Sequence, residues 1–431
     1  MCLPCGMGKS SSSNSRTSAL REEHGDPRGV IEQAEALFDE TVALRRDLHQ
    51  WPELGNELPR TREQVLHALD GLPLDVTLHE TTSGFAALLT GDKPGPTMLL
   101  RGDMDALPMP EDTGVDFSSK VENTMHACGH DTHTAMLVGA AKALSQRKSD
   151  IAGRVLFMFQ SGEEGHGGAE LMLQEGLLDV PSHKHGGESP VTAAFAMHIS
   201  SNLPNGTVAI KGGPIMASSD QLTITVKGRG GHGSSPHFAL DPIPVACEIV
   251  QAIQTLVTRR IDVFDPGVIT VTSIHSGTAY NVIPEHATIL GTMRAMSEKT
   301  RTKIHEGLRR VAEGIAAAHE MDIDIDLEYG YPVTVNDKDF SDFSVAIANT
   351  VLGDKRVIAL PNPVMGAEDF SYVLHQLPGA MMFLGATPPG ENPATAAPNH
   401  SNRVMFDEEA MKTGIAVYTS VALRHLGVPL S

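Results

Sequence analysis

Hydrolysis at a metal site needs several ligands that converge from separate elements, and a carboxylate that handles the proton of water. Two segments of this 431-residue chain offer such groups. Cys128 and His130 are alternate residues that could face one cavity. Glu163 and Glu164 are adjacent carboxylates that point different ways, so one could bind metal while the other acts as a general base. Each pair also has an ordinary alternative, a buried thiol beside a packed histidine and a solvated acidic turn.

Three further segments add two more histidine positions and a glycine-rich turn. His198 ends an apolar stretch, where a histidine is usually a core residue with its hydrogen bonds satisfied. His400 lies on a polar loop, where most histidines have no functional role. The glycine-rich turn could deliver His232 as a hydrogen-bond donor, with Asn281 and Arg294 later in the same region. An arginine can pair with a carboxylate through two hydrogen bonds. A tight turn and a surface charge are the alternatives for these last positions.

The elements that must position these groups have the pattern of an α/β sheet. Residues 97–100 form a predicted buried strand that enters the acidic turn of Asp103 and Asp105. Residues 155–159 are wholly apolar and end just before the paired glutamates, as in a strand covered on both faces. The apolar positions after His130 have the spacing of an amphipathic helix. Carboxylates thus follow strand ends, where open α/β sheets bind ligands.

The pattern changes over residues 214–327. Strand-like and helix-like segments follow one another there in the order β-α-β-β-α-β, which predicts an inserted ferredoxin-like domain. The predicted fold class is therefore α/β, with a discontinuous α/β/α domain and mixed sheet over residues 29–213 and 328–431. Residues 1–28 are polar and Ser-rich and are predicted to be a disordered arm.

Charge and composition argue against several classes of partner. The formal net charge of -20 opposes the negative potential of nucleic acids and anionic membranes, so neither is expected to bind. No apolar run reaches the roughly 20 residues that span a bilayer, and the first residues lack the apolar core of a signal peptide, so we expect a cytoplasmic protein. Cys247 is expected to be buried on an apolar helix face, and the Cys2/Cys5 pair has no assigned role.

Together, and in this order, the segments resemble the metallopeptidase family of aminoacylases and carboxypeptidase G-like enzymes. The resemblance runs from about Val30 to Leu423 and rests on RGDMDALPMPE, MHACGHDTHTAMLVGAAKAL, EEGHGGAELM, GGHGSSPHFALDPI, NVIPEHATILGTMRA and GAEDFS. It is closest to the amidohydrolase branch of hippurate hydrolases, N-acyl-amino-acid deacylases and auxin-conjugate hydrolases. The chain departs from the family at Ser161-Gly162, where proline-alanine is usual, and in the His-rich segment 182–188, whose role is open.

The resemblance implies two divalent ions, with zinc or manganese favoured and cobalt or nickel compatible. Motif by motif, their ligands fall on Cys128, His130, Glu164, His198 and His400. Glu163 matches the family's proton shuttle, and Asp105 resembles the aspartate that orients a ligand. His126 and His133 match no ligand position and are expected to be structural or to lie outside the ligand set.

The resemblance also implies an activity and an assembly. His232 matches a histidine that reaches the neighbouring subunit's active site, which implies a homodimer and makes residues 214–327 a lid and dimerisation domain. Asn281 and Arg294 match substrate-contacting positions. The implied reaction is metal-dependent hydrolysis of the amide bond of N-acyl amino acids, which releases a carboxylic acid and an amino acid. A dipeptidase or carboxypeptidase, and a non-catalytic metal- or ligand-binding relative, are the alternatives, although the intact Glu163 argues against the last.

Overall fold

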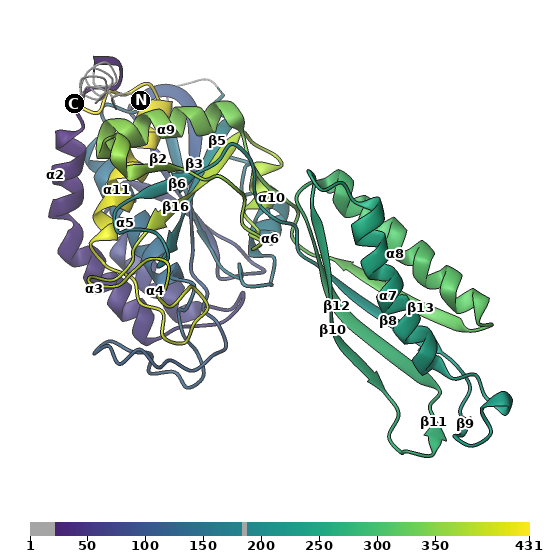
Figure 1. The fold of residues 1–431 in the computed structure, drawn as a ribbon. Coiled ribbons are helices and arrows are strands. Elements are labelled where there is room, and N and C mark those ends of the chain that lie inside the picture. The colour runs from purple at the N-terminus through teal and green to yellow at the C-terminus, as the bar shows by residue number, and fades with distance from the viewer. Residues whose placement is uncertain (1–21, 183–187) are drawn as a thin grey trace, which may run out of the picture. The chain divides into compact units, whose positions relative to one another are not determined.

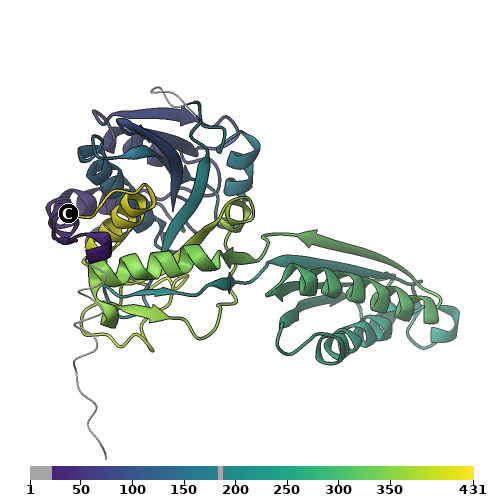
Figure 2. The same cartoon turned by 90° about the horizontal axis from the view of Figure 1, so that it is seen from above.

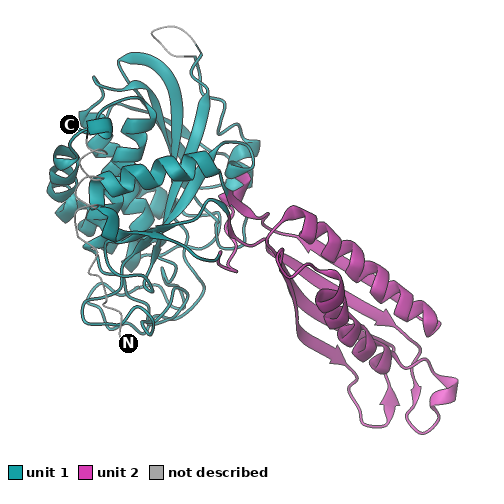
Figure 3. Cartoon of the chain, turned by 45° about the horizontal axis from the view of Figure 1, so that its top comes forward, with its two compact units in different colours: residues 1–213, 336–362, 373–431 teal, residues 214–335, 363–372 magenta. Residues whose placement is uncertain are grey.

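The computed structural model of the chain describes residues 22–182 and 188–431. The Cys2/Cys5 pair and residues 183–187 of the His-rich segment lie outside the described residues. The chain forms two compact units: unit 1 comprises residues 1–213, 336–362 and 373–431, and unit 2 comprises residues 214–335 and 363–372 (Figure 3). The larger unit is thus discontinuous, as predicted. Within the described ranges, no helix is long and apolar enough to cross a membrane.

A mixed eight-stranded sheet forms the centre of unit 1, with the order β1-β2-β4-β3-β5-β16-β6-β15 (Figures 1 and 2). Its strands are β1 (Leu74–Leu78), β2 (Phe85–Thr90), β3 (Lys93–Asp103), β4 (Ala152–Gln160), β5 (Val191–Ser200), β6 (Val208–Ile210), β15 (Val357–Ala359) and β16 (Gly379–Gly385). Strand β4 is buried from Gly153 onward because both faces are covered. Strand β3 runs parallel to both β4 and β5, so the carboxyl ends of these three strands share one edge of the sheet.

Helices flank this sheet (Figures 1 and 2). They are α2 (Arg28–Ala36), α3 (Phe38–Gln50), α4 (Pro59–Ala68), α5 (His130–Gln146), α6 (Gly168–Gln174), α9 (Lys338–Leu352) and α11 (Ala410–His425), with the 3₁₀ turn η2 (Asp354–Arg356). The short helix α10 (Ser371–Leu374) has residues in both units. Helix α5 packs on β3 and against α3 and α11, so nearly all of it is buried. The prediction of an amphipathic α5 was therefore wrong, because helices cover the side that the polar residues had been expected to expose to water.

Unit 2 contains an antiparallel four-stranded sheet with the order β10-β12-β8-β13. Its elements are β8 (Asp220–Lys227), α7 (Pro242–Arg260), β10 (Gly267–Ser276), β12 (His286–Ala295), α8 (Glu298–Ala318) and β13 (Asp322–Tyr329). This order confirms the predicted β-α-β-β-α-β unit. The two helices share one apolar core with the strands, in which Ile224, Ile289 and Leu308 are buried.

Short elements complete the chain. Strands β9 (Gly231–His232) and β11 (Val282–Ile283) form a ribbon, followed along the chain from β9 by the 3₁₀ turn η1 (Pro236–Phe238). Strands β7 (Gly213–Met216) and β14 (Thr334–Asn336) form a second ribbon. Figure 1 shows the β9-β11 ribbon at one end of unit 2, beyond the helices.

Three details differ from the sequence-based expectation. Strand β13 pairs with β8 as far as Tyr329, so unit 2 continues past residue 327. Residues 22–24 form a helical turn rather than part of a disordered arm, and the His24 carbonyl accepts a hydrogen bond from the Leu430 N–H at 3.0 Å. Cys247 is exposed, because it lies two positions from both Val245 and Ile249 and so points away from the buried side of α7.

Candidate metal centre

The five residues expected to be metal ligands lie close together in unit 1. Two groups of donor atoms, each within 4.8 Å of one another, are formed by Cys128, His130 and His198 and by Cys128, Glu164 and His400. The Cys128 Sγ lies 3.4 Å from His198 Nε2 and 3.3 Å from His400 Nε2. Cys128 belongs to both groups.

A glycine between two of these residues makes the local backbone possible. Gly129 precedes α5 with a φ of 90°, which side-chain-bearing residues rarely adopt. A Cβ atom there would lie 2.4 Å from Ile199 Cγ2 and 3.0 Å from Phe406 Cε2. The turn therefore brings the Cys128 segment against the end of β5, where His198 lies.

The His198 ring is held in the tautomer that a ligand needs. Its Nδ1 donates to the carbonyl of Ile199 at 2.8 Å, which leaves the lone pair of Nε2 directed toward Cys128. Burial, together with the nearby His133, lowers the pKa of His198 well below its ordinary value. The ring is therefore neutral, as metal binding requires.

The His130 ring supplies a direct test of whether an ion fits the site. Both ring nitrogens are buried without a hydrogen-bond partner in the part of the chain that the structure describes, although Nδ1 lies 3.3 Å from Asp105 and Nε2 lies 3.4 Å from Asp103. An unsatisfied buried polar atom costs about 1–3 kcal/mol. An ion bound at Nε2 would remove that cost, and the thiolate, imidazole and carboxylate donors suit borderline divalent metals.

The surroundings of Cys128 and His400 shift the pKa values of both side chains. Burial raises the pKa of the Cys128 thiol, and Glu164 adds to this effect. Hydrogen bonds with Cys128 and Glu164 raise the pKa of His400 to about 10. Metal binding would displace the protons of Cys128 and His400.

The loop that carries His400 is tied to the segments of Cys128 and His198. His400 has a φ of 68°, a left-handed conformation that is strained for a residue with a side chain. Its N–H donates to the Ala127 carbonyl at 2.9 Å. The Asn399 side-chain amide donates to the carbonyls of Cys128 and Ile199, each at 3.0 Å. These bonds compensate the backbone strain and fix the position of His400.

The paired glutamates are oriented by one aspartate. The Asp105 carboxylate accepts hydrogen bonds from the N–H groups of Glu163 at 3.0 Å and Glu164 at 2.9 Å. Glu164 Oε1 lies 3.2 Å from His400 Nε2, whereas Glu163 Oε2 lies 4.0 Å from His130 Nε2. Glu163 therefore stands beside the two Cys128 groups without belonging to either of them.

Asp103 and His133 lie at the site, but the sequence did not indicate a role for either of them in metal binding. The Asp103 carboxylate lies 2.6 Å from His133 Nδ1 and 2.7 Å from Arg101 Nη1. Burial raises the pKa of Asp103, but Arg101 and the two histidines outweigh this effect, so the pKa lies well below its ordinary value. The spacing of three residues between His130 and His133 places both on one side of α5 and was the available signal.

Unit 2 brings together two of its three expected site residues. His232 in β9 pairs with Val282, so it lies beside Asn281, whose carbonyl accepts from the Gly233 N–H at 2.8 Å. Arg294 lies in β12, eight residues along the strand from His286, or roughly 26 Å at about 3.3 Å per residue. Arg294 is therefore at the opposite end of the sheet from His232 and Asn281.

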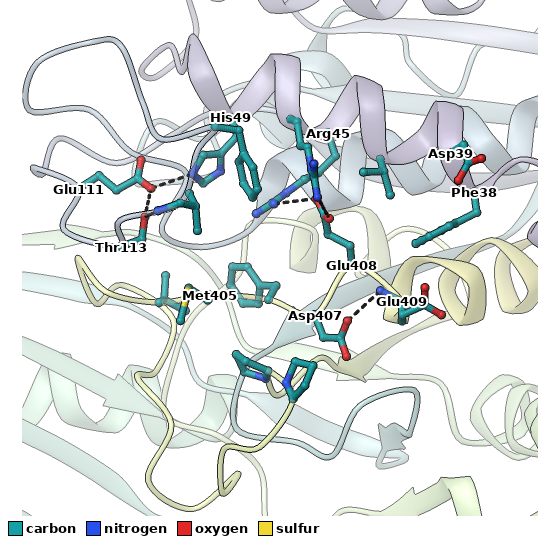
Figure 4. A pocket seen from close by; sticks show the side chains of 18 residues that line it. Phe38, Asp39, Arg45, His49, Glu111, Thr113, Met405, Asp407, Glu408 and Glu409 are labelled. Atoms are coloured by element: carbon teal, nitrogen blue, oxygen red, sulfur yellow. Dashed lines mark hydrogen bonds and ion pairs between the residues drawn. The ribbon is translucent and has the colours of Figure 1, made fainter.

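A cavity of about 460 Å³ in unit 1 lies between α3 and the segment 404–409 (Figure 4). It is lined by none of the expected metal ligands. Its wall residues Arg45 and His49 both pair with Asp131, the residue after His130, at 2.7 Å and 2.8 Å. The cavity thus adjoins a buried ionic network that supports the start of α5.

The sequence profile of Peptidase family M20/M25/M40 matches residues 99–424, which include every expected metal ligand. The chain belongs to peptidase family M20/M25/M40. In this family, the chain is 37% identical to thermostable carboxypeptidase 1 of Saccharolobus solfataricus, over 90% of this chain and 96% of that protein. It is 35% identical to an N-acetylcysteine deacetylase of Bacillus subtilis, over 90% of this chain and 97% of the relative.

A solved M20 structure has a similar fold. The YXEP protein of Bacillus subtilis, described as a dinuclear metal-binding peptidase of the M20 family, matches with a TM-score of 0.77 and 32% identity. The match covers 91% of this chain and 99% of that one. The M20 fold therefore extends over both units, in agreement with the resemblance expected from the motifs.

Proposed function

We propose that this chain hydrolyses the amide bond of N-acyl amino acids and releases a carboxylic acid and an amino acid. Its family and its hydrolase relatives make it a metal-dependent amidohydrolase. The observation that carries the proposal is the pair of ligand groups sharing Cys128, with the Glu163 carboxylate beside them. A binding protein would have no use for a carboxylate held next to a complete ligand set.

Two divalent ions are proposed, one for each ligand group. Cys128, His130 and His198 would hold the first, and Cys128, Glu164 and His400 the second. Zinc or manganese suits the donors best, and cobalt or nickel is compatible. When bound, such ions polarise an amide carbonyl and lower the pKa of water toward about 7.

The protein's own groups then move the proton. Glu163 takes a proton from the attacking water as the new C–O bond forms, and gives it to the amide nitrogen as the C–N bond breaks. Asp105 holds the backbone of Glu163 and so keeps its carboxylate in place through both transfers. The products are the free acid and the free amine, and no oxidant or further reactant is needed.

Residues of unit 2 would supply the remaining contacts with the substrate. The Ser234 N–H donates to His232 Nδ1 at 3.2 Å, so the ring carries its proton on Nε2, where the exposed side chain can donate it to a developing oxyanion. Loss of one such donor costs about 2.7–4 kcal/mol. Arg294 is half-buried, and burial lowers its pKa, so its guanidinium is poorly solvated and suited to a substrate carboxylate.

The separation of these residues supports a homodimer. Since His232 and Asn281 lie at the other end of the sheet from Arg294, one small substrate would meet Arg294 of its own chain and the partner subunit's His232 and Asn281. Strand β10 is an edge strand with Val268 and Ile274 exposed, which suits pairing across a two-fold axis. A fully active monomer in analytical ultracentrifugation would refute this part of the proposal.

A substrate panel tests the reaction. Protein reconstituted with Mn²⁺, Zn²⁺ or Co²⁺ is expected to cleave N-acetyl-, benzoyl- or indoleacetyl-amino acids faster than free dipeptides, and to lose activity with a chelator. Faster cleavage of dipeptides, or of peptides from the carboxyl end, would favour the alternative suggested by the carboxypeptidase relative. No turnover of any amide with any of the three metals would favour a binding protein. The expected cytoplasmic location stays a prediction.

A further inference from the structure

The histidine that the motifs left without a role, His133, lies at the centre of the ligand segments. Its side chain is fully buried in the first turn of α5. Its ring centroid lies 5.4 Å from that of His130 and 4.7 Å from that of His198. His133 belongs to neither of the two ligand groups that share Cys128.

The hydrogen bonds of His133 determine which ring nitrogen carries the proton. The backbone N–H of Ile199 donates to Nε2 at 2.7 Å, so Nε2 must present its lone pair. The proton is then on Nδ1, which donates to the Asp103 carboxylate at 2.6 Å. The ring therefore links the end of β3 to the end of β5 from a position on α5.

The peptide that His133 holds joins His198 to Ile199, so it is bonded directly to the Cα atom of a ligand residue, and the next peptide along β5 carries the Ile199 carbonyl. The Ile199 carbonyl accepts hydrogen bonds from His198 Nδ1 at 2.8 Å and from the Asn399 amide at 3.0 Å. The first bond directs His198 Nε2 toward Cys128, and the second belongs to the loop of His400. The two peptides share the Ile199 Cα atom, so a rotation that broke the bond to His133 would move both the His198 backbone and the Ile199 carbonyl.

We propose that His133 is a positioning residue of the metal centre, which fixes the peptide between His198 and Ile199 and through it the His198 ring. The inference rests on the proposed function only in that the site binds metal. A histidine that merely fills the core would affect folding stability alone, whereas a positioning residue also affects metal affinity in the folded protein. Residues that support ligands in this way typically change metal affinity by about 10–100-fold when replaced.

Two substitutions test the two hydrogen bonds of the His133 ring separately. In His133→Asn the side-chain amide can still donate to Asp103, but nothing accepts from the Ile199 N–H. In His133→Gln the longer side chain can place its amide oxygen near that N–H. We expect the affinity for Zn²⁺, measured by competition with a chromophoric chelator at neutral pH, to fall about 10–100-fold in His133→Asn and less in His133→Gln. The visible spectrum of the Co²⁺-loaded protein should change in the same order.

A nearby histidine provides the matched control. His126 is also buried and lies two residues before Cys128, but neither of its ring nitrogens has a hydrogen-bond partner among residues 22–182 and 188–431. His126→Asn should therefore leave Zn²⁺ affinity unchanged. Wild-type affinity and an unaltered Co²⁺ spectrum in folded His133→Asn, or an equal loss in His126→Asn, would overturn the inference.

Two measurements on the wild-type protein complete the test. Ring ¹⁵N chemical shifts of His133 report its tautomer even if no variant folds, and a proton on Nε2 would overturn the inference because the Ile199 contact could not form. Failure of the wild type to bind Zn²⁺ or Co²⁺ would instead refute the metal centre itself, which distinguishes the two proposals.

Discussion

The Asp105 carboxylate accepts the backbone N–H of Glu163 at 3.0 Å, across 58 positions of the chain. The strands that end just before these residues, β3 and β4, are parallel neighbours, so the contact is set by the sheet and not by local sequence. The same carboxylate accepts the N–H of Glu164 at 2.9 Å. Two adjacent glutamates with different proposed tasks are thus held by one group.

This division of tasks predicts different outcomes at the two glutamates. Glu163→Gln should lower kcat by about 10²–10⁴-fold, because the general base is lost, while bound metal stays at the wild-type level. Glu164→Gln should reduce the metal-to-protein ratio, because Glu164 lies in a ligand group. Elemental analysis and steady-state kinetics on both variants provide the check. Wild-type turnover by Glu163→Gln would contradict the assignment.

Gly129 should be intolerant of any side chain. Gly129→Ala combines an unfavourable φ of 90° with a Cβ placed 2.4 Å from Ile199 Cγ2. The φ alone costs about 1–2 kcal/mol, and overpacking adds about 1–3 kcal/mol. Gly114→Ala is the control, because its φ is 73° and no atom lies within 4 Å of the added Cβ. Urea unfolding should show the larger loss for Gly129→Ala, with less bound metal; equal losses would argue against the close contact.

The ion pair between Arg45 of α3 and Asp131 of α5 should stabilise the folded protein. Arg45 and Asp131 are 3% and 0% exposed, so Arg45→Met leaves a buried carboxylate whose remaining partner is His49. Loss of one partner of a buried pair costs about 3–5 kcal/mol. The exposed pair of Arg28 and Asp26 is a control, because its loss should cost at most about 1 kcal/mol. Chemical denaturation measures both values, and a similar small effect for both variants would count against the network.

His126 should make the metal-free protein sensitive to acid. Burial lowers the pKa of His126 from 6.5 to about 3. The folded state therefore keeps the ring neutral while the unfolded state binds a proton, so this contribution is full above pH 6.5 and is lost as the pH falls toward 3. One proton corresponds to a slope of about 1.4 kcal/mol per pH unit. His126→Asn should lack that slope in unfolding measurements with a chelator present, and parallel curves for the two proteins would contradict the prediction.

The sequence was most informative where a pattern repeats or a motif is long. The apolar run at 155–159 and the spacing after His130 identified β4 and α5, and the β-α-β-β-α-β order identified unit 2. The interrupted helix was less predictable. The chain forms α2 and α3 with a break at Leu37, where no proline or glycine signals it.

The contacts among the site residues could not be predicted from the sequence. The bond between the Ile199 N–H and His133 Nε2 joins a backbone group to a side chain 66 positions away, and peptide groups carry no sequence signal. The prediction that Cys247 is buried was wrong because spacing along a helix decides which side a residue faces. Cys247 lies two positions from the buried residues Val245 and Ile249, and two positions along a helix correspond to nearly opposite sides. Its apolar neighbours in the sequence therefore suggested burial, although its side chain is exposed.

The distance between His232 and Arg294 along unit 2 has a genetic consequence for the proposed dimer. Consider two alleles, one encoding His232→Ala and the other Arg294→Ala, each inactive alone. In a mixed dimer, one active site would receive both defects and the other would receive neither. Cells that express both alleles would regain activity, so complementation between recessive alleles would reveal that each active site is shared between two polypeptides.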